Sequence, residues 1–214
     1  MNFYGHAWVA LREPRSRGFV LGAMLPDLAG MARSRLEGVR DPELAAGVAL
    51  HHRTDAAFHA EPRFARLCAC AAAALRERGV ARGPSLGAAH VAVELLLDGS
   101  LPHDAELAER FAEALAEGAL PDVRGALLWR GDGAQRFARL HARLGSRDIP
   151  AVYREPARVA ERVAWALGSR PRLALDARGE RELGGWLAEL QPQVEAAAPA
   201  LVDELAARLW EERG

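Results

Sequence analysis

The sequence has no lysine, so arginine supplies all 28 of its basic residues. The chain also contains 29 acidic residues, and the formal net charge of its 214 residues is −1 at pH 7. A chain without a large positive charge has no long-range field that would attract nucleic acid, and we expect no nucleic-acid partner. Several arginines nevertheless crowd the N-terminal part of the chain: Arg12, Arg15, Arg17, Arg33, Arg35 and Arg40.

Long apolar runs are also missing. A membrane-spanning helix needs about 20 predominantly apolar residues, and no segment approaches this, so we expect no membrane span. The N-terminal "MNFYGHAWVAL" lacks the basic region and apolar core of a secretory signal. Only two cysteines occur, Cys68 and Cys70, and in a helix residues two apart point to different faces. We expect them to be small core residues of a reduced, cytoplasmic protein.

The residues that are plentiful favour helices. Alanine and leucine, both strong helix formers, are abundant, whereas valine and isoleucine are too few for an extended sheet. Half of the residues are hydrophobic and 27% are charged, which is a globular balance. Because no repeat, low-complexity tract or interdomain linker is visible, the sequence predicts one all-α domain over residues 1–214, with a C-terminal helical extension.

Capping residues predict where several helices begin and end. Asp41 followed by Pro42 predicts the start of a helix that stops before Pro62. Gly79 predicts the end of the following helix, and Ser85 the start of the one after it.

Prolines elsewhere predict interruptions. Pro26 and Asp27, in "MLPDL", are expected at a turn. Pro192 and Pro199 are expected to bend or divide the C-terminal tail. The tail either packs on its own domain or pairs with a second chain, so the oligomeric state is left open.

Three of the seven histidines lie in one short segment, "GVALHHRTDAAFH". On a helix, His51, Asp55 and His59 are spaced i, i+4, i+8 and share one face. His90 and Glu94 form a second i, i+4 pair, in an apolar segment that should be buried. Burying such groups without partners costs several kcal/mol, so we expect them to face each other, another helix or a metal ion.

Nitrogen and carboxylate ligands on facing helices suit a divalent metal such as Mn, Fe or Zn. The alternative is that these side chains are ordinary hydrogen-bonded core residues. His103 and His141 are expected at ordinary surface positions. The predicted metal ligands are His6, Asp27, His51, Asp55, His59, His90 and Glu94.

Five short motifs occur in the order "NFYGH", "GAMLPDL", "HHRTDAAFH", "HVAVELLL" and "SRPRL". In this order the chain resembles the acyl carrier protein phosphodiesterases, an all-α family related to the HD-domain phosphohydrolases. His6, Asp27, His51, Arg53 and Asp55 match the family's motifs in type and position. The segment "LPDL" is also loosely similar to sequences of zinc-dependent phospholipase C-like proteins.

The chain departs from the family at four potential ligand positions. His59 and His90 stand where the family has aspartate, Glu94 replaces another aspartate, and Leu95 replaces a histidine. The change from oxygen toward nitrogen ligands indicates a changed metal preference, a changed substrate or a loss of the family's activity.

The resemblance implies an HD-like fold and hydrolysis of the phosphodiester that joins 4′-phosphopantetheine to a carrier-protein serine. Asp27 and Arg53 would then be catalytic, with Arg53, Arg170 and Arg172 binding the substrate, and an acyl carrier protein would be the partner. Two alternatives stay open: a hydrolase of a small phosphoester or phospholipid, and a non-catalytic helical binding module.

Overall fold

A computed structural model describes residues 1–144 and 149–210, and it confirms the predicted all-α class. The helices of the N-terminal half are α1 (Phe3–Ala10), α2 (Arg17–Met31), α3 (Pro42–His59), α4 (Pro62–Glu77), α5 (Arg82–Ser100) and α6 (Ala105–Glu117). Those that follow are α7 (Pro121–Ala126), α8 (Gly133–Leu144), α9 (Ile149–Tyr153), α10 (Pro156–Gly168) and α11 (Ala177–Trp210). Two short strands, β1 (Leu36–Val39) and β2 (Leu127–Trp129), complete the described elements.

The chain divides into two compact units. Unit 1 consists of Met1–Asp55 with Pro102–Ile149, and unit 2 of Ala56–Leu101 with the chain from Pro150 onward. The chain therefore passes from unit 1 to unit 2 within α3, returns to unit 1 between Leu101 and Pro102, and enters unit 2 again within α9. The prediction of a single domain stays a prediction.

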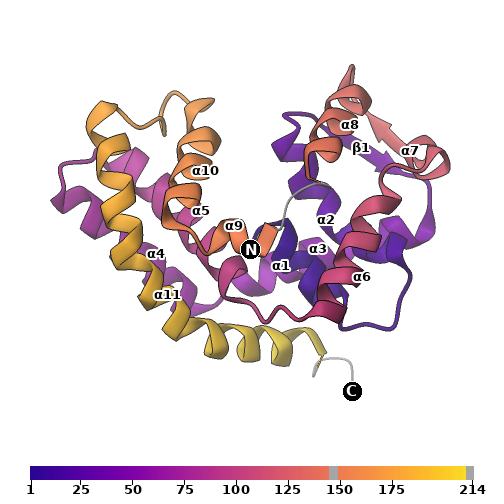
Figure 1. Cartoon of the computed structure of the whole chain (residues 1–214), viewed down its shortest axis with the longest axis horizontal. Coiled ribbons are helices and arrows are strands. Elements are labelled where there is room, and N and C mark those ends of the chain that lie inside the picture. The colour runs from indigo at the N-terminus through magenta and orange to yellow at the C-terminus, as the bar shows by residue number, and fades with distance from the viewer. Residues whose placement is uncertain (145–148, 211–214) are drawn as a thin grey trace. The chain divides into compact units, whose positions relative to one another are not determined.

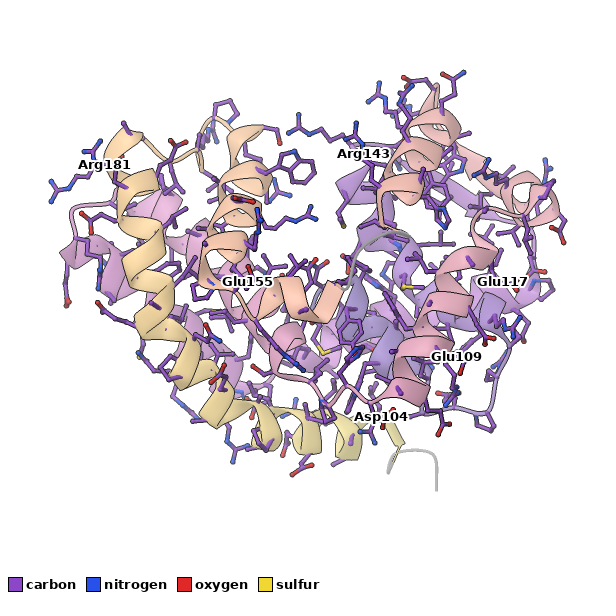
Figure 2. All side chains as sticks on the ribbon, in the orientation of Figure 1. Asp104, Glu109, Glu117, Arg143, Glu155 and Arg181 are labelled. Carbon is purple, nitrogen blue, oxygen red and sulfur yellow. The ribbon has the colours of Figure 1, made fainter. Side chains whose placement is uncertain are left out.

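In unit 1, α2 is the central helix, and α1, α6 and α8 pack against it. Figure 2 shows Glu109 and Glu117 along α6, with Asp104 at its start, where the Asp104 carboxylate accepts a hydrogen bond from the Leu107 amide. Helix α1 is buried along its whole length because nearly all of its residues are apolar or small. The side chains that α1 and α2 present to each other thus form much of the core of unit 1.

Glycines let α2 and α3 approach each other closely. A Cβ atom at Gly22 would overlap the carbonyl oxygen of Leu44, and one at Gly47 would overlap that of Phe19. Only a residue without a Cβ atom permits such a crossing. Asp41 caps α3 as predicted, since its carboxylate accepts a hydrogen bond from the Leu44 amide at 2.9 Å.

Two expectations for unit 1 are wrong, and one feature of it was not predicted. Pro26 and Asp27 lie inside α2 rather than at a turn, because the packing of this mostly buried helix outweighs the loss of one backbone donor. The strands β1 and β2, which pair antiparallel with Leu36 opposite Trp129, were not predicted. His141 is buried rather than at the surface, and its Nε2 bonds to the carbonyl oxygen of Leu115.

In unit 2, α5 and α11 each pack against both α4 and α10 (Figure 1). The indole of Trp186, on α11, is buried and donates a hydrogen bond to the carbonyl oxygen of Ala71 at 3.1 Å. Gly79 ends α4 as predicted, with a φ of 82° that suits glycine.

The tail is one helix, α11, that contains Pro192 and Pro199, and Figure 1 shows that its axis bends, which is one of the two expected outcomes. Two other expectations for unit 2 are wrong. Ser85 lies inside α5, where its hydroxyl donates to the carbonyl oxygen of Val80, and it does not cap the helix. Cys70 is exposed and is not a core residue. None of the helices in the described ranges has the length and apolar character that a membrane crossing requires.

Candidate metal centre

The structure brings four of the predicted ligands together in unit 1. His6 comes from α1, Asp27 from α2, and His51 and Asp55 from successive turns of α3. One ligand atom each of His6, Asp27 and His51 lie within 4.8 Å of one another. The i, i+4 spacing on α3 therefore does what the sequence predicts, and the close crossing of α2 and α3 brings Asp27 to the same place.

The distances in this group approach those of a coordination sphere. The Nε2 atom of His6 lies 3.4 Å from Oδ1 of Asp55 and 3.9 Å from Oδ2 of Asp27. Two ligands of a tetrahedral cation with bonds of ~2.05 Å are roughly 3.3 Å apart. The rings of His6 and His51 have centroids 3.8 Å apart and planes inclined by 31°. A cation could thus be bound with small side-chain movements.

His51 is held in the tautomer that a metal ligand needs. Its Nδ1 atom lies 2.9 Å from the carbonyl oxygen of Ala23, and a carbonyl can only accept, so Nδ1 carries the proton. In the neutral ring the Nε2 atom then keeps its lone pair. Metal-binding histidines commonly donate their other N–H in this way, which fixes the ring's orientation.

Burial and neighbouring charges set the protonation of the group. Burial, together with the nearby His6, lowers the pKa of His51 to about 3, although the hydrogen bond to Ala23 and the charge of Asp55 act in the opposite direction. For Asp55, burial alone would raise the pKa, but His6 and the positive N-terminus lower it to about 2. A neutral imidazole beside an ionised carboxylate is a donor set for a cation.

The group is more accessible on its carboxylate side. The imidazole side chains of His6 and His51 are 1% and 4% exposed, whereas the carboxylate side chains of Asp27 and Asp55 are 28% and 35% exposed. A closed structural site would bury all of its ligands. Because the carboxylates are partly exposed, a small molecule can reach the group from their side.

The other three predicted ligands meet in unit 2. His59 is the last residue of α3, and His90 and Glu94 lie one turn apart on α5. Both imidazole Nε2 atoms approach the same carboxylate oxygen of Glu94, at 3.1 Å for His59 and 3.2 Å for His90. That all seven residues serve one metal site stays a prediction.

The predicted substrate-binding arginines lie on the surface of both units. Arg53 is an exposed residue of α3 in unit 1, and Arg170 and Arg172 are exposed residues that follow α10 in unit 2. Their binding of a phosphate stays a prediction. Leu95, which replaces a histidine of the resembled family, is a buried residue of α5.

Sequence reasoning missed two contributors to these groups. The carbonyl oxygen of Ala23 orients His51, and no sequence signal marks it, because any residue at that position has a carbonyl. The ring of Phe64 lies against both histidines of unit 2, with centroid distances of 5.4 Å to His59 and 5.5 Å to His90. An aromatic residue in the first turn of α4 is a weak signal, typical of core packing.

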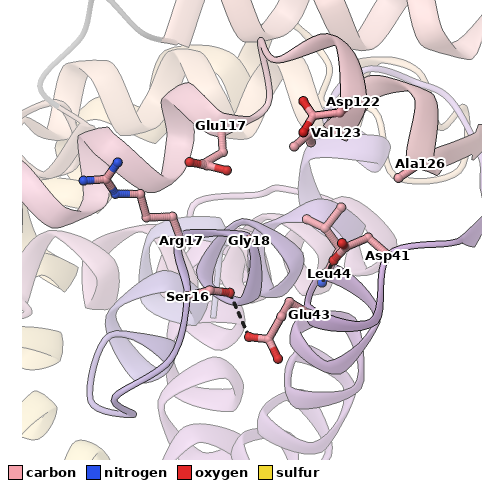
Figure 3. Close-up of a pocket in the computed structure, with 10 residues that line it drawn as sticks. All are labelled: Ser16, Arg17, Gly18, Asp41, Glu43, Leu44, Glu117, Asp122, Val123 and Ala126. Carbon is pink, nitrogen blue, oxygen red and sulfur yellow. Dashed lines mark hydrogen bonds between the residues drawn. The ribbon is translucent and has the colours of Figure 1, made fainter.

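Unit 1 also contains an open cavity of about 410 Å³ whose lining includes none of the predicted ligands (Figure 3). Two of its carboxylates, those of Asp41 and Glu43, already have partners in the fold. Asp41 caps α3, and Glu43 accepts hydrogen bonds from Ser16, at 2.7 Å, and from Arg15. These contacts hold the start of α3 against the segment that precedes α2, so the cavity is not the candidate site.

Comparisons with protein-family models, with curated proteins and with solved structures find no match for this chain.

Proposed function

We propose that the chain is a metal-dependent phosphodiester hydrolase whose catalytic metal is held in unit 1. The observation that carries this proposal is the orientation of His51: its Nδ1–H donates to the carbonyl oxygen of Ala23, and its ring lies against that of His6 beside two carboxylates. The neutral ring of His51 therefore offers the lone pair of its Nε2 atom. The donor set therefore fits a divalent cation, which is Mn, Fe or Zn in this proposal.

A divalent cation at this place would supply Lewis acidity and would lower the pKa of a water molecule. The residues of the chain have separate roles. His6 and His51 hold the cation from the buried side, while Asp55 balances its charge. Asp27, with its partly exposed carboxylate, holds the cation and orients the attacking water.

The substrate class rests on the resemblance to acyl carrier protein phosphodiesterases, whose reaction breaks a phosphodiester of a carrier-protein serine. Arg53, exposed on the same helix as His51, is the proposed contact for a phosphate oxygen. The arginines nearest the N-terminus are less suited to dock an acidic carrier protein. Arg15 pairs with Glu43, and the guanidinium of Arg12 lies 3.8 Å from the ring centroid of Trp8.

The test is hydrolysis by the purified chain, reloaded separately with Mn²⁺, Fe²⁺ or Zn²⁺. Two substrates are compared: bis(4-nitrophenyl) phosphate, and a carrier protein that bears 4′-phosphopantetheine. We expect turnover of the carrier protein that is lost in Asp27→Asn and unchanged in His52→Ala, which alters an exposed neighbour of His51.

Turnover of the small diester alone would replace the carrier protein with a small phosphoester as the substrate. No turnover of either substrate with any of the three metals would contradict the proposed function. Because Asp27→Asn changes a partly exposed side chain almost isosterically, circular dichroism should show that this variant is folded.

A further inference from the structure

A second group of metal-ligating side chains lies wholly within unit 2, where the proposed function does not use it. His59, His90 and Glu94 each place one ligand atom within 4.8 Å of the others. We propose that unit 2 binds a Zn²⁺ ion of its own through these three side chains. This proposal does not rest on the proposed function, since no residue of unit 1 takes part.

The distances within the group are those of ligands around one cation. Oε1 of Glu94 lies 3.1 Å from Nε2 of His59 and 3.2 Å from Nε2 of His90. Two ligands of a tetrahedral zinc ion with bonds of ~2.05 Å are roughly 3.3 Å apart. Because both Nε2 atoms lie against the same oxygen of Glu94, they point toward the same region, with the two ring centroids 5.1 Å apart.

The three side chains are held in place by the fold of unit 2. His90 and Glu94 are fixed relative to each other by one turn of α5, which packs against α4. Phe64, near the start of α4, contacts both imidazoles and itself packs on Phe58, with a centroid distance of 4.3 Å. Such aromatic packing fixes ring orientations before a ligand arrives, which reduces the entropy lost on binding.

The charge and exposure of the group also fit an exchangeable cation. Glu94 is only 16% exposed, whereas the two histidine side chains are 37% and 45% exposed. A largely buried carboxylate needs positive charge beside it. With neutral imidazoles, the group carries one negative charge and is open to solvent on the histidine side, so that a cation can enter.

The types of ligand select zinc among the common divalent cations. Two imidazole nitrogens and one carboxylate oxygen form a set that zinc uses in sites with three protein ligands and one open position. Hard cations such as Mg²⁺ and Ca²⁺ prefer an all-oxygen environment. The nitrogen atoms at His59 and His90 thus favour Zn²⁺.

The test is isothermal titration calorimetry of the metal-free full-length chain with ZnCl₂, combined with native mass spectrometry to count bound ions. The informative variant is Glu94→Gln. Its amide oxygen can still accept hydrogen bonds from both imidazoles, so the metal-free arrangement survives while the negative charge is lost. Glu161→Gln, on an exposed residue of α10, is the matched control.

We expect the wild-type chain and Glu161→Gln to bind one more Zn²⁺ ion than Glu94→Gln. The affinity at this site should fall by more than the roughly 10- to 100-fold that loss of an outer hydrogen-bond partner costs. His90→Ala should remove the same binding event. The binding of this Zn²⁺ ion should persist in His51→Ala, because no residue of unit 1 belongs to the site.

Three results would overturn the proposal. Equal zinc binding by the wild-type chain and Glu94→Gln would show that the three side chains form only a hydrogen-bonded group. A single ion lost in both Glu94→Gln and His51→Ala would show one shared site. No zinc binding at all would contradict it outright. If instead the ion of unit 2 binds while Asp27→Asn leaves metal content and hydrolysis unchanged, the proposed function fails and this inference stands.

Discussion

Replacing Gly47 by alanine should disrupt the unit 1 site, although Gly47 itself is not one of the proposed ligands. The added Cβ atom would overlap the carbonyl oxygen of Phe19 and lie 2.8 Å from the amide nitrogen of Ala23. Both atoms belong to the backbone of α2, which cannot rotate away as a side chain could. The helices α2 and α3 must therefore move apart by about 1 Å before these contacts become ordinary.

That movement has a cost that can be worked out from the contacts. Overpacking of a well-packed interior costs about 1–3 kcal/mol. The hydrogen bond from His51 to the carbonyl oxygen of Ala23 is 2.9 Å long and would break, and leaving buried groups unsatisfied costs about 1–3 kcal/mol. Alanine gains about 1 kcal/mol over glycine in helix propensity. The net loss in the free energy of unfolding should be about 1–5 kcal/mol.

Urea denaturation followed by circular dichroism would measure this loss, and the midpoint of thermal unfolding should fall by roughly 2–20 °C for a chain of this size. The matched control is Gly30→Ala, in α2, where an added Cβ atom meets nothing within 4 Å. That variant should be as stable as the wild type or more stable by up to about 1 kcal/mol. Wild-type stability and metal content in Gly47→Ala would refute the reasoning.

Two further predictions concern titratable groups. The pKa of His51 is lowered from 6.5 to about 3 by burial and by His6. Between these two values, His51 is protonated in the unfolded chain but neutral in the folded, metal-free chain. The free energy of unfolding should therefore fall by about 1 kcal/mol per pH unit as the pH drops through this range, and it should fall less steeply in His51→Gln. The same dependence on pH in the wild type and in His51→Gln would contradict this prediction. Burial, with the charge of Glu94, raises the pKa of Cys68 to about 12, whereas Cys70 is exposed. Iodoacetamide should alkylate only Cys70 in the folded chain, as peptide mass spectrometry would show, and equal labelling would count against the structure.

The ends of helices could be predicted where a local signal controls them. Asp41 with Pro42 at the start of α3, and Gly79 after α4, act through their own backbone and side-chain geometry, and the structure confirms them. Pro26 misled because the cost of one proline in a helix is local, whereas the packing that offsets it is not. Pro192 and Pro199 bend α11, as expected, but do not divide it, because the apolar face of this helix is buried over most of its length.

The candidate site could be predicted in pairs but not as a whole. The i, i+4 spacings of His51 with Asp55 and of His90 with Glu94 place each pair on one helix face, and the structure brings each pair together with a histidine from elsewhere in the chain. Which histidine joins which pair depends on helix packing, which the sequence does not reveal. His6 joins the first pair and His59 the second. Each group therefore belongs to a different unit of the fold.

The central claim is that the buried imidazoles and the carboxylates of unit 1 hold a divalent metal. The most direct measurement is the metal content of the purified chain by mass spectrometry, before and after incubation with Mn²⁺ or Zn²⁺. Wild type, His51→Ala and Asp55→Asn are compared, with His52→Ala as the control for loss of an exposed imidazole. We expect one ion per chain to be lost in both site variants and kept in His52→Ala. Unchanged metal content in His51→Ala and Asp55→Asn, or no metal in the wild-type chain, would contradict the claim.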